Sequence, residues 1–334
     1  MYSKIILISL FAVSNFCCGI SSSSQDKNET LIDSSSHIAV SPDTTGGIVY
    51  FSFDNAVSWQ NKSNGLPPGI NLTDIAASGD DLIAATKQHG LFMFNNTRNS
   101  WSNVMSPKQV KNIIDAVIVF KDNIFIGTEG GGVFASMNQG NNWLEYNKGL
   151  SNLTIRRMVI IDDSLFIGTN DGLYVFNEKK KEWVSKFNGG FLQVNGITQL
   201  SNDLFIGTNK GVYKSTRPYN SWVRVLPDKS VHNIAVGNGN VYALAYNELF
   251  TSPDKGITWR SIQQGLPKNL YSFHLIQKDG KLFIGQWDGV YEGNGKGNWK
   301  SFSKGLPGKF PATELVNYNQ IIVAASSGWV STNK

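Results

Sequence analysis

The stretch LFIGTNDGLYVFNEKKKEW (residues 165–183) returns in similar form as LFIGTNKGVYKSTRPYNSW (204–222) and LFIGQWDGVYEGNGKGNW (282–299). Each copy has an apolar run, a glycine followed by an apolar and an aromatic residue, a polar turn and a closing tryptophan. The closing tryptophans are Trp59, Trp101, Trp143, Trp183, Trp222, Trp259 and Trp299, at intervals of 42, 42, 40, 39, 37 and 40 residues. Such a period of short strands predicts one four-stranded β-propeller blade per repeat. We expect each tryptophan to be buried between neighbouring sheets.

Seven second strands can be placed along the chain, at 82–86, 124–128, 165–169, 204–208, 241–245, 282–286 and 321–325. First strands precede them near 72–78, 113–120, 154–161, 194–200, 231–237, 271–277 and 312–317. The last unit stops after a third strand, whereas an N-terminal segment supplies a third strand and Trp59 opens a fourth. The sequence therefore predicts an all-β, seven-bladed β-propeller of four-stranded antiparallel blades, closed by an N-terminal strand that completes the last blade. Segments 47–52 and 328–332 are alternative third strands for that blade.

The N-terminus has the pattern of a targeting segment. Lys4 provides a positive charge, and the apolar run 5–13 is too short to span a bilayer. Both cysteines of the chain, Cys17 and Cys18, follow this run. Their placement resembles a bacterial lipoprotein signal, which implies lipidation of Cys18. A plain secretory signal is the alternative.

We therefore expect three regions along the chain. Residues 1–19 form a signal peptide, residues 20–45 a flexible Ser-rich tether, and residues 46–334 the propeller. This organisation implies an exported protein, lipid-anchored in the bacterial cell envelope at the outer membrane or in the periplasm, or secreted if the signal is not lipidated. Because both cysteines precede the propeller, its body contains neither disulfides nor cysteine-ligated zinc.

Composition argues against several classes of function. The net charge of +5 comes mainly from scattered lysines, and no stretch combines clustered basic residues with aromatics as a nucleic-acid groove would. The four histidines do not have the spacing of a metal site. We expect a monomer that uses no metal or other cofactor and binds no nucleic acid.

Three of the turns before the closing tryptophans share a motif. The segment SPDKGITW (252–259) fits S-x-D-x-G-x-T-W at every fixed position, SFDNAVSW (52–59) fits it with two small-residue changes, and SMNQGNNW (136–143) carries Asn for Asp. The chain thus resembles the Asp-box (BNR-repeat) propellers, which include sialidases, some glucan hydrolases, sortilin-type receptors and photosystem II assembly-factor-like proteins. In these proteins the turns lie opposite the binding face. The resemblance therefore implies a structural role for Asp54, Asp254, Gly256 and Trp259.

The resemblance does not extend to the sialidase active site. Those enzymes use three arginines for the substrate carboxylate and a tyrosine nucleophile paired with a glutamate. Of the six arginines in this chain, only Arg156 and Arg157 begin a first strand. The F/Y-R-I-P signature is also absent from the N-terminal part. We expect no sialidase activity.

Alignment of the first strands brings five polar residues to nearly equivalent positions near the channel mouth, namely Asp74, Arg157, Asn233, His274 and Glu314. Gly196 leaves a gap in this set, and Asp115 and His232 lie one residue away. Asp74 and Glu314 become neighbours through ring closure, so they are the candidate carboxylate pair of a glycosidase. The alternative is that the mouth is polar simply because water fills it.

The loops after the second strands should share this face. The sixth unit departs from the repeat with Trp287 and Asp288, and Tyr246 lies in the corresponding loop of the fifth. An exposed tryptophan there would stack on a sugar ring or anchor a protein loop. The alternative is that Trp287 packs against an adjacent blade.

The sequence favours a non-catalytic binding protein over an enzyme. We expect it to bind a protein or glycan at the channel-mouth face, through Arg157, Asn233, His274, Trp287, Asp288 and Tyr246. One alternative is a glycoside hydrolase, sialidase-like or glucan-cleaving, that uses Asp74 and Glu314. The other is an assembly or stability factor for a membrane complex.

Overall fold

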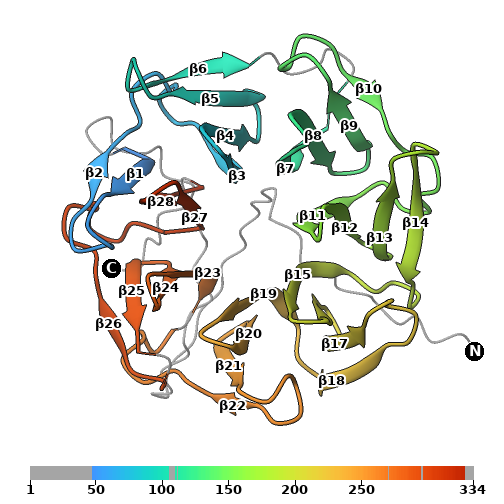
Figure 1. Ribbon diagram of the computed structural model, residues 1–334. Helices are drawn as coiled ribbons and strands as arrows, with labels where there is room; N and C mark the ends of the chain where they lie inside the picture. Colours follow the sequence, from blue (N-terminus) through green and yellow to red (C-terminus); the bar gives the residue numbers. More distant parts are fainter. Residues whose placement is uncertain (1–46, 105–109, 111, 270, 295, 328–334) are drawn as a thin grey trace, which may run out of the picture. The chain divides into compact units, whose positions relative to one another are not determined.

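The computed structural model describes residues 47–104, 110, 112–269, 271–294 and 296–327. Within these residues the chain forms 28 strands in seven four-stranded sheets and no helix. The described strands all belong to one compact unit, residues 37–334, and their sheets are the blades of a β-propeller (Figure 1). The predicted fold class is therefore confirmed. The signal, Cys18, the tether and the candidate strand 328–332 lie outside the described residues.

Blades 1 to 6 each use four consecutive strands, which run from the centre outward. The strands of blades 1 to 3 are β3 (Leu72–Ser78), β4 (Asp81–Thr86), β5 (Leu91–Asn95), β6 (Ser100–Val104); β7 (Ile114–Phe120), β8 (Asn123–Thr128), β9 (Gly132–Ser136), β10 (Leu144–Glu145); and β11 (Ile155–Ile161), β12 (Ser164–Thr169), β13 (Gly172–Asn177), β14 (Glu182–Phe187). Those of blades 4 to 6 are β15 (Val194–Leu200), β16 (Asp203–Thr208), β17 (Gly211–Thr216), β18 (Val223–Pro227); β19 (Val231–Gly237), β20 (Asn240–Ala245), β21 (Glu248–Ser252), β22 (Arg260–Ser261); and β23 (Ser272–Lys278), β24 (Lys281–Gln286), β25 (Gly289–Gly293), β26 (Trp299–Ser301).

Blade 7 joins the two ends of the described chain. Its inner strands are β27 (Glu314–Tyr318) and β28 (Ile321–Ala325), and its outer strands are β1 (Val49–Ser52) and β2 (Gln60–Asn61). β1 pairs antiparallel with β28, with Tyr50 opposite Ala324. The segment that begins at Val49 therefore supplies the third strand of this blade. No helix of the described residues is long and apolar enough to cross a membrane.

The hydrophobic core lies between adjacent blades. The second strands are almost wholly buried because each is covered on both faces by neighbouring sheets; in β12 every residue after Ser164 is buried. One cluster illustrates the arrangement, since it combines Phe125 of blade 2 with Met158 and Ile167 of blade 3. Continuous runs such as LFIG are therefore core strands.

Several tryptophans join their blade to the preceding one through a repeated set of contacts. In blade 3, Trp183 is only 3% exposed, its Nε1 donates to the carbonyl of Tyr146 at 2.6 Å, and its backbone N–H donates to the carbonyl of Lys148 at 2.8 Å. The next residue, Gly149, has a φ of 91°. The same contacts recur at Trp59, Trp101 and Trp299, where the glycines of the preceding blade are Gly305, Gly65 and Gly265. We call this arrangement the Gly–Trp clasp.

The expectation that every closing tryptophan is buried is wrong for two of them. Trp222 and Trp259 are only partly buried. Each clasp glycine is followed by a leucine, as Gly149 is by Leu150. The corresponding positions of blades 3 and 4 have Gly189-Gly190 and Asp228-Lys229 instead. Trp222 instead stacks on Phe187 with ring centroids 5.0 Å apart. A clasp accompanies deep burial at four tryptophans, whereas Trp143, which is 7% exposed, donates its Nε1 to the carbonyl of Gly140 in its own turn.

Candidate functional site

Each blade presents two ends. First strands begin and second strands finish at the same end, as the pairing of Leu72 with Thr86 shows. We call this end, which also carries the loops between the second and third strands, the B–C face. The turns between the third and fourth strands lie at the opposite end, the C–D face.

The Asp-box-like turns on the C–D face satisfy their own polar groups. Asp254 Oδ1 accepts from the Ser252 hydroxyl and the Thr258 backbone N–H, both at 2.8 Å, and Oδ2 accepts from the Thr258 hydroxyl at 2.6 Å. These bonds, led by that of the Thr258 hydroxyl, lower the pKa of Asp254 to about 2. Asp54 makes the corresponding bonds with Ser52 and Ser58. Both carboxylates are thus engaged within their turns.

Gly256 occupies a left-handed position of this turn, with a φ of 90°. Its backbone N–H donates to the Ser252 hydroxyl at 2.7 Å. Ala56 adopts the same region at a φ of 67° in the turn of blade 7. Trp259 closes the turn, and its indole Nε1 has no hydrogen-bond partner among the described residues.

A β-bulge sets the register of the first strands at the B–C face. In blades 1 to 5 the pairing skips one residue near the start of the first strand, for example between Ile155 and Arg157. The residues after the skip, with their equivalents in blades 6 and 7, form what we call the inner ring: Asp74, Ala116, Arg157, Gly196, Asn233, His274 and Glu314. The residues skipped include Asp115 and His232, as their one-residue offset in the sequence predicts.

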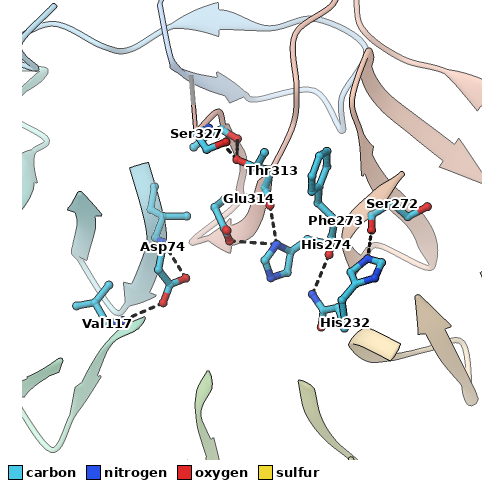
Figure 2. A network of polar contacts seen from close by, with 12 residues as sticks. Asp74, Val117, His232, Ser272, Phe273, His274, Thr313, Glu314 and Ser327 are labelled. Carbon is cyan, nitrogen blue, oxygen red and sulfur yellow. Dashed lines mark hydrogen bonds and ion pairs between the residues drawn. The ribbon is translucent and has the colours of Figure 1, made fainter. Parts of the chain in front are cut away.

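Inner-ring side chains bond to the first strand of the next blade (Figure 2). Asp74 Oδ2 accepts from the backbone N–H of Val117 at 2.9 Å, and Asn233 Nδ2 donates to the carbonyl of Phe273 at 3.0 Å. His274 Nδ1 donates to the carbonyl of Thr313 at 2.9 Å and lies 3.0 Å from Glu314 Oε2. These side chains therefore hold adjacent blades together.

The two candidate catalytic carboxyl groups are directed at different partners (Figure 2). Asp74 accepts backbone N–H groups on both oxygens, from Ile75 and Val117 at 2.9 Å each, and is 9% exposed. Glu314 faces His274, and its side chain is 12% exposed. Burial, followed by the charge of Asp74, raises the pKa of Glu314 well above its usual value. We therefore place a proton on Glu314, because Asp74 already has two N–H donors that favour its ionised form.

His274 is a neutral imidazole in the folded protein. Burial, and then the charge of Arg157, lowers its pKa to about 3. Since Nδ1 donates its proton, Nε2 is an acceptor, and it is buried without a hydrogen-bond partner among the described residues. Arg157 itself is partly buried, and its charge acts to lower the pKa values of Asp74 and Glu314 against the effect of burial.

The pKa of Glu314 predicts how stability depends on pH. Above about pH 4.5 the unfolded chain loses this proton while the folded protein keeps it, so the free energy of unfolding falls as the pH rises. Glu314→Gln removes this loss. We expect the variant to gain stability relative to the wild type between pH 5 and 8, as measured by urea unfolding at each pH. His274→Gln is the comparison of opposite sign. In the wild type, the unfolded chain protonates His274 as the pH falls below 6.5 while the folded protein keeps it neutral, so the free energy of unfolding falls. The His274→Gln variant lacks this loss. A constant difference between Glu314→Gln and the wild type across this range would contradict the assignment.

Aromatic side chains gather on the B–C face of blades 5 and 6. Tyr271 stacks on His232 with centroids 5.7 Å apart and an interplanar angle of 14°, and it contacts Phe273 at 4.8 Å. Tyr246 meets Tyr271 edge to face at 5.8 Å. Tyr246 and Tyr271 are 65% and 41% exposed. We call these four residues the aromatic cluster.

Trp287 is not an exposed platform, because it is partly buried and its Nε1 donates to the carbonyl of Asn269 at 2.9 Å. Its neighbour Asp288 accepts from the Tyr291 hydroxyl at 3.0 Å on Oδ2, whereas Oδ1 is buried without a partner among the described residues. The repeat pattern of the sequence did not single out Tyr271. Its position one residue before a first strand, beside the loop that carries Tyr246 in the preceding blade, was the signal that could have found it.

The B–C face carries both the inner ring and the aromatic cluster. The inner-ring carboxyl groups are buried and bonded to different partners, so they are not arranged as two groups flanking one scissile bond. No group of acidic, histidine and cysteine side chains in the described residues could hold a metal ion. The exposed side chains of this face include the aromatic Tyr246 and Tyr271 and the polar Lys87, Gln88 and Lys210.

Comparison with known proteins finds no matching family model and no matching curated protein. Several solved propellers are similar in structure. YCF48 bound to D1 peptide has a TM-score of 0.61 at 10% identity, covering 88% of this chain and 100% of that one. BamB from Moraxella catarrhalis has a TM-score of 0.53 at 12% identity, covering 79% and 84%. The GH74 xyloglucanase from Xanthomonas campestris has a TM-score of 0.56 at 16% identity, covering 72% and 45%.

The chain therefore spans less than half the length of that xyloglucanase. At these identities the likeness shows the propeller fold alone. Membership of the Asp-box family stays a prediction, carried by the three turns that match its motif.

Proposed function

We propose that the protein is an exported, lipid-anchored propeller that binds a protein or glycan ligand on its B–C face and performs no catalysis. The observation that carries this proposal is the pair of exposed, mutually contacting tyrosines, Tyr246 and Tyr271, beside the inner ring. Solvent-exposed aromatic side chains held in place by their neighbours are typical of binding surfaces. The lipid would be attached at Cys18, and residues 20–45 would form the tether.

Structural neighbours of both ligand classes support the proposal. One was solved as YCF48 bound to D1 peptide, and another is a GH74 xyloglucanase. Action as an assembly factor would be one form of protein binding. The hydrolase alternative has less support here, because Asp74 and Glu314 serve the joints between blades.

The test is capture of ligands from the host's envelope fraction by the tagged full-length protein. A B–C face variant, Tyr246→Ser with Tyr271→Ser, is compared with a C–D face variant, Val57→Ser with Ile257→Ser, whose residues are 53% and 80% exposed. We expect the first variant to lose the captured ligand and the second to retain it. Loss only with the C–D face variant would move the site to the opposite face. Release of reducing ends from a captured glycan, abolished in Glu314→Gln, would instead establish a hydrolase.

A further inference from the structure

We propose that the C–D face lies on a lipid bilayer and buries three exposed side chains, Val57, Met137 and Ile257, among the head groups of a zwitterionic phospholipid surface. We call these three residues the apolar tips. The inference concerns the face opposite the proposed ligand site, and it rests on the proposed function only for the anchor at Cys18. It follows from the turns that carry the tips, their places around the ring, the charges near them and the reach of the chain before the propeller.

The apolar tips belong to the three C–D turns that keep the Asp-box-like motif. Val57 of blade 7 is 53% exposed, Met137 of blade 2 is 48% exposed and Ile257 of blade 5 is 80% exposed. Phe53, in the same turn as Val57, is 53% exposed as well. All four occupy variable positions of the motif, where the turn itself does not need an apolar side chain. Single exposed apolar residues are common on protein surfaces, but here they recur on the same turn in three blades.

Hydrogen bonds within each of these turns fix the backbone that carries the tips. In blade 2, Asn138 Oδ1 accepts from the Ser136 hydroxyl at 3.0 Å and from the Asn142 backbone N–H at 2.8 Å. Asp54 and Asp254 make the same pair of bonds in blades 7 and 5. A side chain on a fixed turn costs little backbone freedom when a partner buries it, which favours binding.

The places of the three turns fit a flat partner. Blades 2, 5 and 7 are spread around the ring, with one or two blades between each pair, and the turns join the outer strands of their sheets (Figure 1). The tips are therefore separate points toward the rim of one face, and three such points define a plane. A protein partner typically buries a cluster of apolar side chains near the centre of its interface. A bilayer surface contacts separate points on one plane equally well. The described C–D turns of the other four blades contain no exposed large hydrophobic residue.

The charges of the C–D face favour a zwitterionic surface over an anionic one. Exposed basic residues of the C–D turns are Arg98, Lys179, Lys180, Lys181, Lys255 and Lys296. Exposed aspartates at the turns between first and second strands, nearer the propeller axis, are Asp80, Asp81, Asp122, Asp162, Asp163 and Asp279. Lys255 lies two residues before Ile257, so a basic group that can contact lipid phosphate accompanies the most exposed tip. Because the face as a whole is mixed in charge, we expect burial of the tips, not net charge, to drive binding.

The chain before the propeller is long enough for this orientation. Ile48 lies at the B–C face, since its carbonyl accepts from the backbone N–H of Ser326, directly after β28. A first strand such as β3 has 7 residues, which at about 3.3 Å per residue gives a depth of about 23 Å from face to face. Residues 20–45, the expected tether, would span about 85 Å when fully extended. A lipid at Cys18 therefore allows the C–D face to lie on the membrane while the B–C face is turned toward its ligand.

The experiment places an environment-sensitive fluorophore at each tip of the full-length protein. Cys17→Ser and Cys18→Ser remove both native thiols, so the label attaches only to the cysteine of Val57→Cys, Met137→Cys or Ile257→Cys. An N-terminal histidine tag on a nickel-chelating lipid replaces the anchor and holds every variant at vesicles of phosphatidylcholine. Phe191→Cys is the matched control, because Phe191 is an 86% exposed apolar residue in a loop leading to a first strand, on the B–C face. Thermal unfolding of each variant checks that its fold is intact.

We expect the fluorophore emission to shift to the blue at all three tips on vesicle binding and to stay unchanged at residue 191. Adding Val57→Ser and Ile257→Ser to the Met137→Cys variant should remove most of the shift at residue 137, since the three turns contact one surface together. The absence of a shift at the tips, a shift at residue 191 instead, or a shift that requires phosphatidylglycerol in the vesicles would overturn the inference.

Two further outcomes separate this inference from the proposed function. A soluble protein captured through the tips, without a shift on vesicles, would assign the C–D face to a protein partner and overturn the inference. A shift at the tips, combined with ligand capture that the Tyr246→Ser with Tyr271→Ser variant retains, would support the inference and remove the proposed ligand site alone.

Discussion

Trp183→Ala is expected to lower the free energy of unfolding by about 3–5 kcal/mol, the cost of deleting a large buried aromatic side chain. The indole is 3% exposed and packs against Phe176 with centroids 5.0 Å apart. Its Nε1 bond to the carbonyl of Tyr146 would also be lost, which leaves a buried acceptor unpaired. For a domain of this size the loss corresponds to a fall in Tm of roughly 10 °C.

Trp222→Ala is the matched comparison. Its indole also donates to a carbonyl, that of Lys186 at 3.0 Å, but the side chain is partly exposed because no clasp covers it. We expect a clearly smaller loss of stability than for Trp183→Ala. Urea unfolding followed by circular dichroism measures both. Equal losses in the two variants would show that the clasp does not decide how much each tryptophan contributes.

The fold could be predicted because the repeat is written into the sequence seven times. Runs such as LFIG at 165–168 are apolar at every position, which indicates strands buried on both faces. The spacing of the tryptophans then fixed the number of blades. The glycines of the clasp also have a regular spacing, since each of the four follows a closing tryptophan by six residues, as Gly149 follows Trp143.

The candidate site was harder to predict because strand register does not reveal what a side chain bonds to. Asp74 and Glu314 do lie at equivalent positions of adjacent blades, as the alignment of first strands indicated. Their partners, a backbone N–H of Val117 and the imidazole of His274, depend on distances across blade interfaces. A sequence pattern of period two records which face of a strand a residue occupies, but it carries no information about these contacts. The departure of Trp287 from the repeat suggested an exposed aromatic platform. Its hydrogen bond to the carbonyl of Asn269, in another loop, does not follow from the repeat pattern.

Gly149→Ala should be nearly as destabilising as the loss of the tryptophan, although it adds a single methyl group. A Cβ at this position would lie 2.2 Å from the backbone carbonyl oxygen of Trp183, and the φ of 91° is unfavourable for any other residue. The left-handed backbone costs about 1–2 kcal/mol and the overpacking about 1–3 kcal/mol more, so we expect a loss of about 2–5 kcal/mol.

Gly239→Ala separates the two contributions to that loss. Gly239 has a φ of 74°, and no atom lies within 4 Å of the position its Cβ would take, so its substitution tests the backbone cost alone. We expect a loss of about 1–2 kcal/mol in the same urea titration. If the two variants lose equal stability, contact between Gly149 and Trp183 contributes nothing. A larger loss for Gly149→Ala would show that the close approach of two backbones, possible only at glycine, is what joins blade 2 to blade 3 at the clasp.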